Sequence, residues 1–373
     1  MRILIIHSFY RASLPSGENQ VVLNQVSALQ DAGYEVALWG PSSPEDPGLP
    51  DEIRTGVRLL ANSGADPSSE IRRFDPDLIH IHNLFPNIAT RWMYRSNPPI
   101  LMTVHNYRTV CANGLLLRQG RPCEDCLPDR RVMGVVHACY KDSRLASLVA
   151  ARHQVQLIKA IKRGVNTLIF PSKFQKAIVE PLAEGVPTVH IPNYVPKIEG
   201  SYVDGSIRSQ FLYLGRLTQE KGLESLLDIW PKGVPLVIAG DGPLRHVLEI
   251  QASDANLNVD FAGQVDGSER ARLLSTARAL ILPSLTYEVD PLVVAEALSA
   301  GVPCIVRDHT APAQLARVSP AVRTFSEATT LEDCLTELRS TDFVEEALDL
   351  YNATWSQRKW LKSFSDVSER LVG

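Results

Sequence analysis

Short apolar runs alternate with segments of helical periodicity along the first half of the chain. The apolar runs predict strands at residues 2–8, 34–40, 77–83, 100–106, 166–172 and 188–195. Residues 18–33, between the first two runs, have the spacing of an amphipathic helix that ends at Gly33. Strands that alternate with helices in this way predict a parallel, doubly wound sheet.

The same alternation begins again in the second half. Apolar runs predict strands at residues 210–217, 235–240, 258–263, 279–284 and 303–306, and the polar, irregular stretch 195–209 predicts a linker. We therefore expect an α/β protein with two Rossmann-like domains, at residues 1–196 and 208–354. The amphipathic segment 355–373 is expected to form a helix that packs back on the first domain.

Composition narrows the class of protein. The chain has 373 residues, 45% hydrophobic and 21% charged, which is typical of a soluble globular protein. Its formal net charge of -4 argues against bulk binding to nucleic acid. The opening "MRILII" is too short for a signal-peptide core, and no apolar stretch reaches the roughly 18 residues of a membrane span. We expect the protein to be cytoplasmic.

A helix start stands in the stretch "YEVDPLVVAEALSAGVPCIV", residues 287–306. Asp290 is a good N-cap and Pro291 suits the first helical position, so together they predict a helix that begins there. Gly301 supplies a left-handed stop at the other end. The unit is therefore expected to be strand, loop, helix and strand.

Two glutamates flank this predicted helix start, Glu288 in the loop and Glu296 inside the helix. In open α/β sheets, ligands bind where strands end and helices begin, and backbone N–H groups near Leu292 and Val293 would meet an anion there. The alternative is a solvated loop glutamate and an exposed helix glutamate.

A second candidate site lies in "YLGRLTQEKGLESLL", which contains the cations Arg216 and Lys221. Gly215 and Gly222 would let the backbone approach a ligand closely, and Gly240 follows the next predicted strand. Two cations in such a loop can hold a diphosphate and stabilise its charge as it leaves. A basic surface loop and a simple tight turn are the alternatives.

Together these segments resemble the retaining glycosyltransferases of family 4. The resemblance rests on "SGENQVVLNQVSALQDAGYEV", "GRLTQEKGLESLL", "AGDGPL", "FAGQV" and the two-glutamate stretch, and it covers nearly the whole chain. It implies the GT-B fold, in which two facing Rossmann-like domains hold the active site in the cleft between them. It also implies metal-independent transfer of a sugar, with retention of configuration, from a nucleotide-sugar donor, for which UDP is the expected nucleotide. The acceptor would be a carbohydrate or a lipid-linked saccharide in polysaccharide or glycoconjugate biosynthesis.

The resemblance also implies roles for single residues. Arg216 and Lys221 would grip the donor diphosphate, Glu288 would face the hydroxyls of the donor sugar, and Glu296 would bind the ribose. Gly17 would face the donor phosphates through its backbone N–H.

In the first half, His105 ends a predicted strand and resembles the histidine with which the family contacts the donor sugar. His82 and Asn83, at the end of another strand, would line the acceptor side, whereas His80 is expected to be packed in the core.

This chain departs from many family members at Asp290 and Pro291, where they have an aromatic residue and a glycine. Asp290 would either cap the helix or repel a phosphate. Asp290 therefore keeps open the alternative of a catalytically silent scaffold in a membrane-associated assembly. A second alternative is a nucleotide-sugar epimerase of the same fold, which would bind the same donor but turn over without an acceptor.

Four cysteines, Cys111, Cys123, Cys126 and Cys139, lie in an expected insertion at residues 108–141. A Cys-x-x-Cys pair flanked by two further cysteines predicts a structural Zn²⁺ site with four thiolate ligands, for which His137 is a substitute ligand. Free thiols, two disulfides and an iron–sulfur cluster are the alternatives.

The first half is also locally basic. Residues 91–176 contain fifteen Lys and Arg residues and four Asp and Glu residues, and the segment 143–163 predicts an amphipathic basic helix. Such a helix favours an anionic membrane surface, at the inner face of the membrane, and a polyprenyl-diphosphate-linked acceptor. The alternative is a solvated helix that packs its apolar stripe on the domain. No nucleic-acid-binding motif is present.

Overall fold

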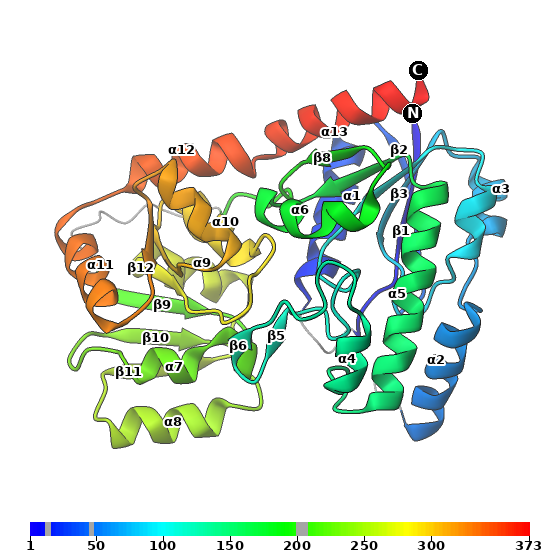
Figure 1. The fold of residues 1–373 in the computed structure, drawn as a ribbon. Helices are drawn as coiled ribbons and strands as arrows, with labels where there is room; N and C mark the ends of the chain where they lie inside the picture. The colour runs from blue at the N-terminus through cyan, green and yellow to red at the C-terminus, as the bar shows by residue number, and fades with distance from the viewer. Residues whose placement is uncertain (12–15, 45–47, 199–207) are drawn as a thin grey trace. The chain divides into compact units, whose positions relative to one another are not determined.

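The computed structural model describes residues 1–11, 16–44, 48–198 and 208–373. These residues form two compact units (Figure 1). Unit 1 comprises Met1–Leu116, Cys123–Tyr194 and Gln357–Gly373, and unit 2 comprises Leu117–Pro122 and Val195–Ser356. Residues 199–207 of the predicted linker lie outside the described residues. No described helix combines the length and the apolar composition that crossing a bilayer requires.

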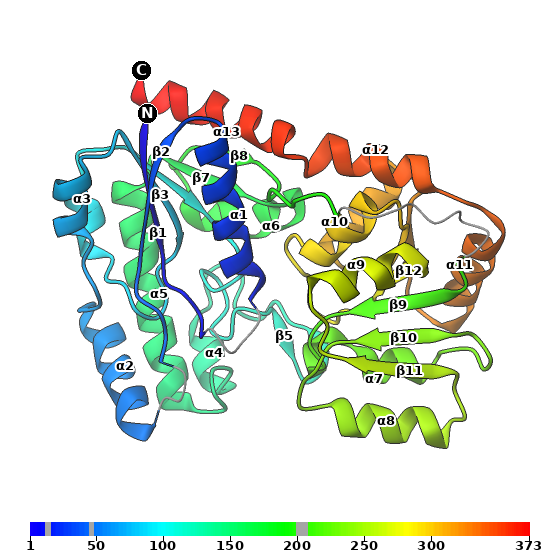
Figure 2. The same cartoon turned by 180° about the vertical axis from the view of Figure 1, so that it is seen from behind.

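Unit 1 is built on a parallel sheet with the strand order β2-β1-β3-β4-β7-β8. Its strands are β1 (Arg2–His7), β2 (Glu35–Trp39), β3 (Leu78–Asn83), β4 (Ile100–Thr103), β7 (Thr167–Phe170) and β8 (Thr188–His190). Its α-helices are α1 (Gly17–Asp31), α2 (Leu49–Ala61), α3 (Ser68–Phe74), α4 (Val132–Val136), α5 (Arg144–Gly164), α6 (Lys173–Val179) and α13 (Gln357–Val372), and its 3₁₀ helices are η1 (Arg91–Arg95) and η2 (Glu180–Ala183). The opposite views in Figures 1 and 2 show α5 on one face of this sheet and α1 on the other.

Unit 2 repeats the plan with a parallel sheet of order β11-β10-β9-β12-β13-β14. Its strands are β9 (Gln210–Leu214), β10 (Leu236–Ala239), β11 (Val259–Gly263), β12 (Ala277–Leu282), β13 (Cys304–Arg307) and β14 (Val322–Phe325). Its α-helices are α7 (Leu223–Leu227), α8 (Arg245–Asp254), α9 (Gly267–Thr276), α10 (Leu292–Ser299), α11 (Ala328–Ser340) and α12 (Val344–Thr354), and its 3₁₀ helices are η4 (Gln219–Lys221) and η5 (Ala311–Arg317). The short antiparallel pair β5 (Leu117–Arg118) and β6 (Arg121–Pro122) belongs to the insertion. The predicted α/β class is confirmed in both units.

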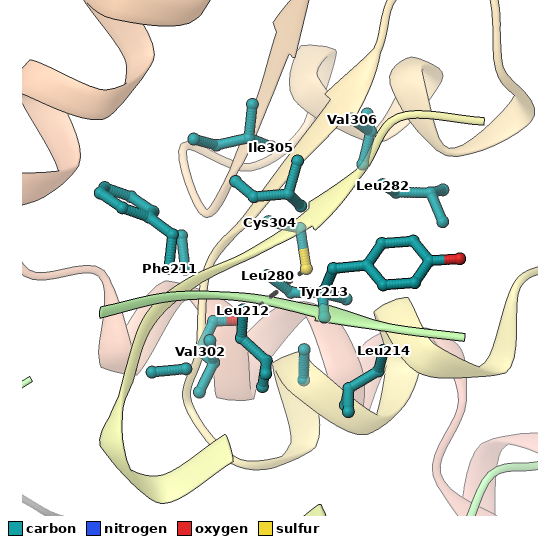
Figure 3. Close-up of a cluster of buried hydrophobic side chains, with 14 of the residues drawn as sticks. Phe211, Leu212, Tyr213, Leu214, Leu280, Leu282, Val302, Cys304, Ile305 and Val306 are labelled. Carbon is teal, nitrogen blue, oxygen red and sulfur yellow. Dashed lines mark hydrogen bonds between the residues drawn. The ribbon is translucent and has the colours of Figure 1, made fainter. Parts of the chain in front are cut away.

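The central strands of unit 2 are apolar on both faces because helices cover both sides of the sheet. Figure 3 shows Cys304 of β13 among Leu212, Leu280 and Val302, and all four side chains are fully buried. Burial raises the pKa of the Cys304 thiol, so this cysteine behaves as a small apolar core residue.

Helix α13 packs into the core of unit 1. Its residues Trp360, Phe364 and Val367 are buried together with Ile3 and Ile5 of β1. The apolar stripe of this amphipathic helix is therefore covered by the first strand of the chain, which lies more than 350 residues earlier in the sequence.

Buried histidines form a row next to this core. His80 and His82 lie on β3, and the ring of His80 sits 5.4 Å from that of Phe364 and 4.2 Å from that of His82. Burial lowers the pKa of His7 and His153 to about 4 and that of His80 and His105 to about 3. These imidazoles are consequently neutral at pH 7.

We predict that Phe364→Ala destabilises unit 1 by about 3–5 kcal/mol, because the substitution leaves a cavity where an almost fully buried ring stood. Urea denaturation followed by hydrogen exchange within unit 1 measures this loss. Lys362→Ala, which truncates an exposed side chain of the same helix, is the matched control and should change stability little. Equal stabilities for the two variants would contradict the packing of α13 on unit 1.

We also predict that unit 1 loses stability as the pH falls. Its buried histidines have folded-state pKa values below the ordinary 6.5, so below about pH 6.5 the unfolded chain binds protons that the folded unit does not. The loss should build up between pH 6.5 and about 3, the lowest of these folded-state pKa values, while above pH 6.5 these groups contribute no pH dependence. Hydrogen exchange of unit 1 at a series of pH values, corrected for the intrinsic exchange rate, measures the slope, and a flat profile over this range would disprove the prediction.

Candidate functional site

In unit 2, the loops that follow β9 and β10 touch each other backbone to backbone. Gly240 has a φ of +142°, and a Cβ atom there would lie 1.8 Å from the carbonyl oxygen of Gly215. No side chain fits at this point, so Gly240 is required for the contact. The ends of the two neighbouring strands β9 and β10 are thereby brought into direct backbone contact.

The loop after β9 is joined to the loop after β12 by a partly buried ion pair. The Nζ atom of Lys221 lies 2.7 Å from Oε1 of Glu288, and the hydroxyl of Ser284 donates to the same oxygen at 2.6 Å. Gly222 is left-handed, and a Cβ atom there would lie 2.2 Å from the carbonyl oxygen of Pro283. The two loops are therefore held together both by charge and by close backbone packing.

Glu288 is an ionised carboxylate held in an unusual backbone conformation. Its φ is +51°, in the left-handed region that non-glycine residues rarely occupy. Burial alone would raise its pKa, but Lys221, Ser284 and Arg216 outweigh that effect and leave the pKa lowered. A strained backbone around a buried charge points to a functional position.

Arg216 presents a more exposed cation than Lys221. Its side chain is 52% exposed and pairs with Glu220 at 3.1 Å, while the side chain of Lys221 is 22% exposed. The backbone carbonyl of Arg216 accepts a hydrogen bond from the hydroxyl of Tyr213 on β9 at 2.7 Å, which anchors the loop to the strand that precedes it.

The start of α10 differs from the prediction. The N-cap is Pro291 and no side chain caps the first turn, so the expectation that Asp290 is the N-cap is wrong. Instead, Oδ1 of Asp290 accepts a hydrogen bond from Nε1 of Trp355 at 2.8 Å. Leu292 and Val293 stand at the first positions of the helix, as the anion-binding interpretation requires.

Glu296 lies inside α10 with only 8% of the residue exposed. Its Oε1 atom accepts from Nη1 of Arg270 at 3.0 Å, whereas its Oε2 atom is buried and has no hydrogen-bond partner among the described residues. Burial raises the pKa of this carboxyl, and Arg270 only partly offsets the rise. A buried acceptor without a donor is costly unless a ligand supplies one.

In unit 1, the predicted site residues lie in two places, one at the start of α1 and one at the ends of β3 and β4. Gly17 is the first residue of α1. At the carboxyl ends of β3 and β4, His82 and His105 stack with their ring centroids 5.0 Å apart, and Nδ1 of His82 lies 2.8 Å from Nε2 of His105. Asn83 accepts a hydrogen bond from the N–H of Phe85, which turns the chain after β3.

Two residues with unusual environments did not figure among the predicted site residues. Arg270 on α9 is the partner of Glu296, and only the fold brings it there, because its own segment has no recognisable motif. Glu18 on α1 accepts from Nδ2 of Asn106 at 2.6 Å, and its buried Oε2 atom has no hydrogen-bond partner in the described part of the chain. Burial raises the pKa of this carboxyl. Its position next to Gly17 was the only available signal.

The predicted zinc site is not supported. All six cysteines are free thiols, and the described residues contain no group of three or more His, Cys, Asp or Glu side chains arranged to hold a metal ion. The thiol of Cys111 instead donates to Oδ1 of Asn113 at 2.9 Å. Burial, followed by the neighbouring cysteines Cys111, Cys139 and Cys123, raises the pKa of Cys126 to about 11. The thiols influence one another without forming a set of ligands.

Both halves of the chain match known protein families. Residues 203–318 match the family "Glycosyl transferases group 1", and residues 15–196 match "Glycosyltransferase Family 4".

Full-length relatives are similar over most of the chain. Phosphatidyl-myo-inositol mannosyltransferase of Mycolicibacterium smegmatis is 26% identical over 327 residues, which cover 80% of this chain and 74% of the relative. Glycogen synthase of Mycobacterium tuberculosis is 24% identical over 353 residues, 82% of this chain and 77% of the relative.

Solved structures share the fold. Sucrose-phosphate synthase of Thermosynechococcus elongatus aligns with a TM-score of 0.71 at 17% identity, over 100% of this chain and 99% of that one. HepE of Anabaena, solved in complex with UDP-glucose, aligns with a TM-score of 0.64 at 14% identity, over 99% of this chain and 100% of that one. The chain therefore belongs to glycosyltransferase family 4, has the GT-B fold, and is a glycosyltransferase.

Proposed function

We propose that this glycosyltransferase uses a nucleotide-diphosphate sugar, with UDP as the first nucleotide to test, and transfers the sugar with retention of configuration. The observation that carries the proposal is the buried Oε2 atom of Glu296, which has no hydrogen-bond partner within the described ranges. A ribose hydroxyl would supply the donor that this buried oxygen lacks. HepE, which shares the fold, is solved with UDP-glucose.

The diphosphate would bind at the strand ends of unit 2. Lys221 is already paired with Glu288, so the two side chains together carry little net charge, and the more exposed Arg216 is the cation with which a phosphate would exchange partners. The first turn of α10 at Leu292 and Val293 would add backbone N–H donors. Gly215 and Gly240 would hold the loops after β9 and β10 in backbone contact beside the phosphates.

The sugar would be read by Glu288, which is ionised at neutral pH and accepts hydrogen bonds from hydroxyl groups. In unit 1 we assign contact with the transferred sugar to His105, contact with the phosphates to the N–H of Gly17, and the acceptor side to His82 and Asn83. Attack and departure on the same face, with the leaving phosphate taking the proton of the acceptor, need positioning and charge stabilisation rather than a protein nucleophile or a catalytic metal.

The acceptor is proposed to be a carbohydrate, and specifically a saccharide on a polyprenyl diphosphate held at an anionic membrane surface. Helices α2, α4 and α5 lie side by side in unit 1 (Figures 1 and 2). They expose large apolar side chains that a monomer in water would bury: Leu49, Ile53, Val57 and Leu60 on α2, Val132 and Val136 on α4, and Leu145 and Leu148 on α5. We call these eight residues the apolar face.

The charges beside the apolar face favour a bilayer as its occupant. Helix α5 contains no Asp or Glu, and its exposed side chains continue from Leu145 and Leu148 to Arg152 and Lys159 along one line of the helix. The acidic Glu52 of α2 is paired with Lys141 at 2.7 Å. Apolar side chains that insert among lipid tails, flanked by cations that meet anionic headgroups, are the features of an interfacial helix.

We predict that Glu296→Ala and Arg216→Ala each weaken the binding of UDP-sugars at least tenfold, the loss of about 1.4 kcal/mol expected when a charge-assisted contact is removed. Calorimetric titration with UDP-, GDP- and ADP-sugars measures this, and Glu332→Ala, an exposed change on α11, is the control.

Wild-type protein that binds none of these donors would contradict the proposed donor site. Bound donor that is converted to an isomer without any acceptor would identify an epimerase instead. Bound donor without any turnover would favour the scaffold.

We predict that wild-type protein sediments with vesicles that contain anionic phosphatidylglycerol and less with neutral phosphatidylcholine vesicles. The double change Ile53→Ser, Leu145→Ser should reduce this binding about tenfold or more, because both side chains are lost from the inserted face. Val247→Ser with Val318→Ser, which removes two exposed apolar side chains from unit 2, is the matched control. Equal binding of both double variants would disprove the membrane assignment.

A further inference from the structure

The bond between His82 and His105 determines which ring nitrogens carry protons. Their 2.8 Å contact joins Nδ1 of His82 to Nε2 of His105, so one of these two nitrogens must be the donor. The other nitrogen of His82, Nε2, is buried and has no hydrogen-bond partner among the described residues. The two possible directions of the bond therefore leave different atoms unsatisfied.

If His105 were the donor, neutral His82 would carry its proton on Nε2, and a buried N–H would have no acceptor. If His82 is the donor through Nδ1, its Nε2 is only an unused lone pair. A buried N–H without an acceptor is the rarer and costlier defect in folded proteins. The second direction is thus favoured, and it places the proton of neutral His105 on Nδ1.

The surroundings of His82 and His105 disfavour their protonated, charged forms, in which both ring nitrogens would carry a proton. The ring of His82 packs 4.2 Å from that of His80 and 6.3 Å from that of His7, and no described carboxylate pairs with either His82 or His105. Burial, together with these neighbouring imidazoles, lowers the pKa of both rings far below neutrality. His80 is itself held by a 2.8 Å contact between its Nε2 and the hydroxyl of Thr103.

We propose that His82 is a positioning residue that holds His105 in the Nδ1–H tautomer and so presents an N–H donor to an oxygen atom of the transferred sugar. In water, the neutral imidazole of histidine prefers the Nε2–H form, so the fold reverses the intrinsic preference of His105. Nδ1 of His105 accepts from or donates to no described residue, which leaves it for a ligand. The sugar contact rests on the proposed function, whereas the tautomer rests on unit 1 alone.

The first test is nitrogen-15 NMR of histidine-labelled protein at pH 7.5 without ligand. The signal of His105, assigned by its absence in His105→Gln, should show a protonated Nδ1 and an unprotonated Nε2. The exposed His246 on α8 gives an internal reference, which should show the preference found in water. A protonated Nε2 on His105 would overturn the proposal, whether or not the protein transfers sugar.

The second test separates positioning from mere packing. In His82→Asn, the side-chain amide can replace Nδ1–H as a donor to His105, whereas His82→Leu keeps the bulk and removes the donor. We expect His82→Leu to shift His105 toward the Nε2–H form and to lower kcat about tenfold, with the donor KM little changed, and His82→Asn to restore both the tautomer and most of the rate. Unchanged kcat in His82→Leu would overturn the positioning role.

These measurements also separate the two proposals. If wild-type His105 carries its proton on Nδ1 and no nucleotide sugar binds, the tautomer assignment stands and the proposed donor site fails. If His82→Leu does not fold, the spectra of wild-type protein and of His82→Asn still decide the tautomer.

Discussion

The arrangement of unit 2 depends on the partly buried ion pair between Lys221 and Glu288. It ties the loop after β9 to the loop after β12, and these two loops carry the charged residues Arg216, Lys221 and Glu288 that are assigned to the donor. Each charge offsets the cost of taking the other out of water, so a change at Lys221 would remove the ion-pair partner of Glu288, whose side chain is only 12% exposed. The left-handed backbone at Glu288 persists because the side chain is held at its far end by Lys221 and Ser284. The ion pair and the close packing of Gly222 on Pro283 therefore fix the distance between two loops whose paired residues lie 67 positions apart in the sequence.

Local patterns predicted the framework well. Strands such as β9 and β12 are continuous apolar runs that lie in buried parallel sheets, and Gly301 adopts the left-handed conformation expected at the end of α10, with a φ of +67°. These features depend on neighbours within a few positions. Helix α2 was not predicted, although Pro50 and two acidic residues in its first turn are helix-start signals, because its exposed apolar residues gave no reason to expect a buried face.

The details of the candidate sites could not be predicted because they depend on distant partners. Asp290 has the chemistry of an N-cap, but its carboxylate instead accepts a hydrogen bond from Trp355, which lies 65 residues further on. The spacing of Cys123 and Cys126 matches a zinc knuckle, yet the fold does not bring the four thiols into one ligand set. The pairing of Glu296 with Arg270 likewise joins two helices through tertiary structure, and no local sequence rule contains it.

The position of α13 has a consequence for how the protein is made. The nascent chain emerges from the ribosome with its N-terminus first, and domains commonly fold in that order. Here unit 1 includes Trp360 and Phe364, so its core is incomplete until the whole of unit 2 has been synthesised. Unit 2 is complete at Ser356 and is therefore able to fold first, while most of unit 1 has already emerged with an apolar surface uncovered. During synthesis, the part of the chain that is made earliest is thus the part that most needs protection by chaperones.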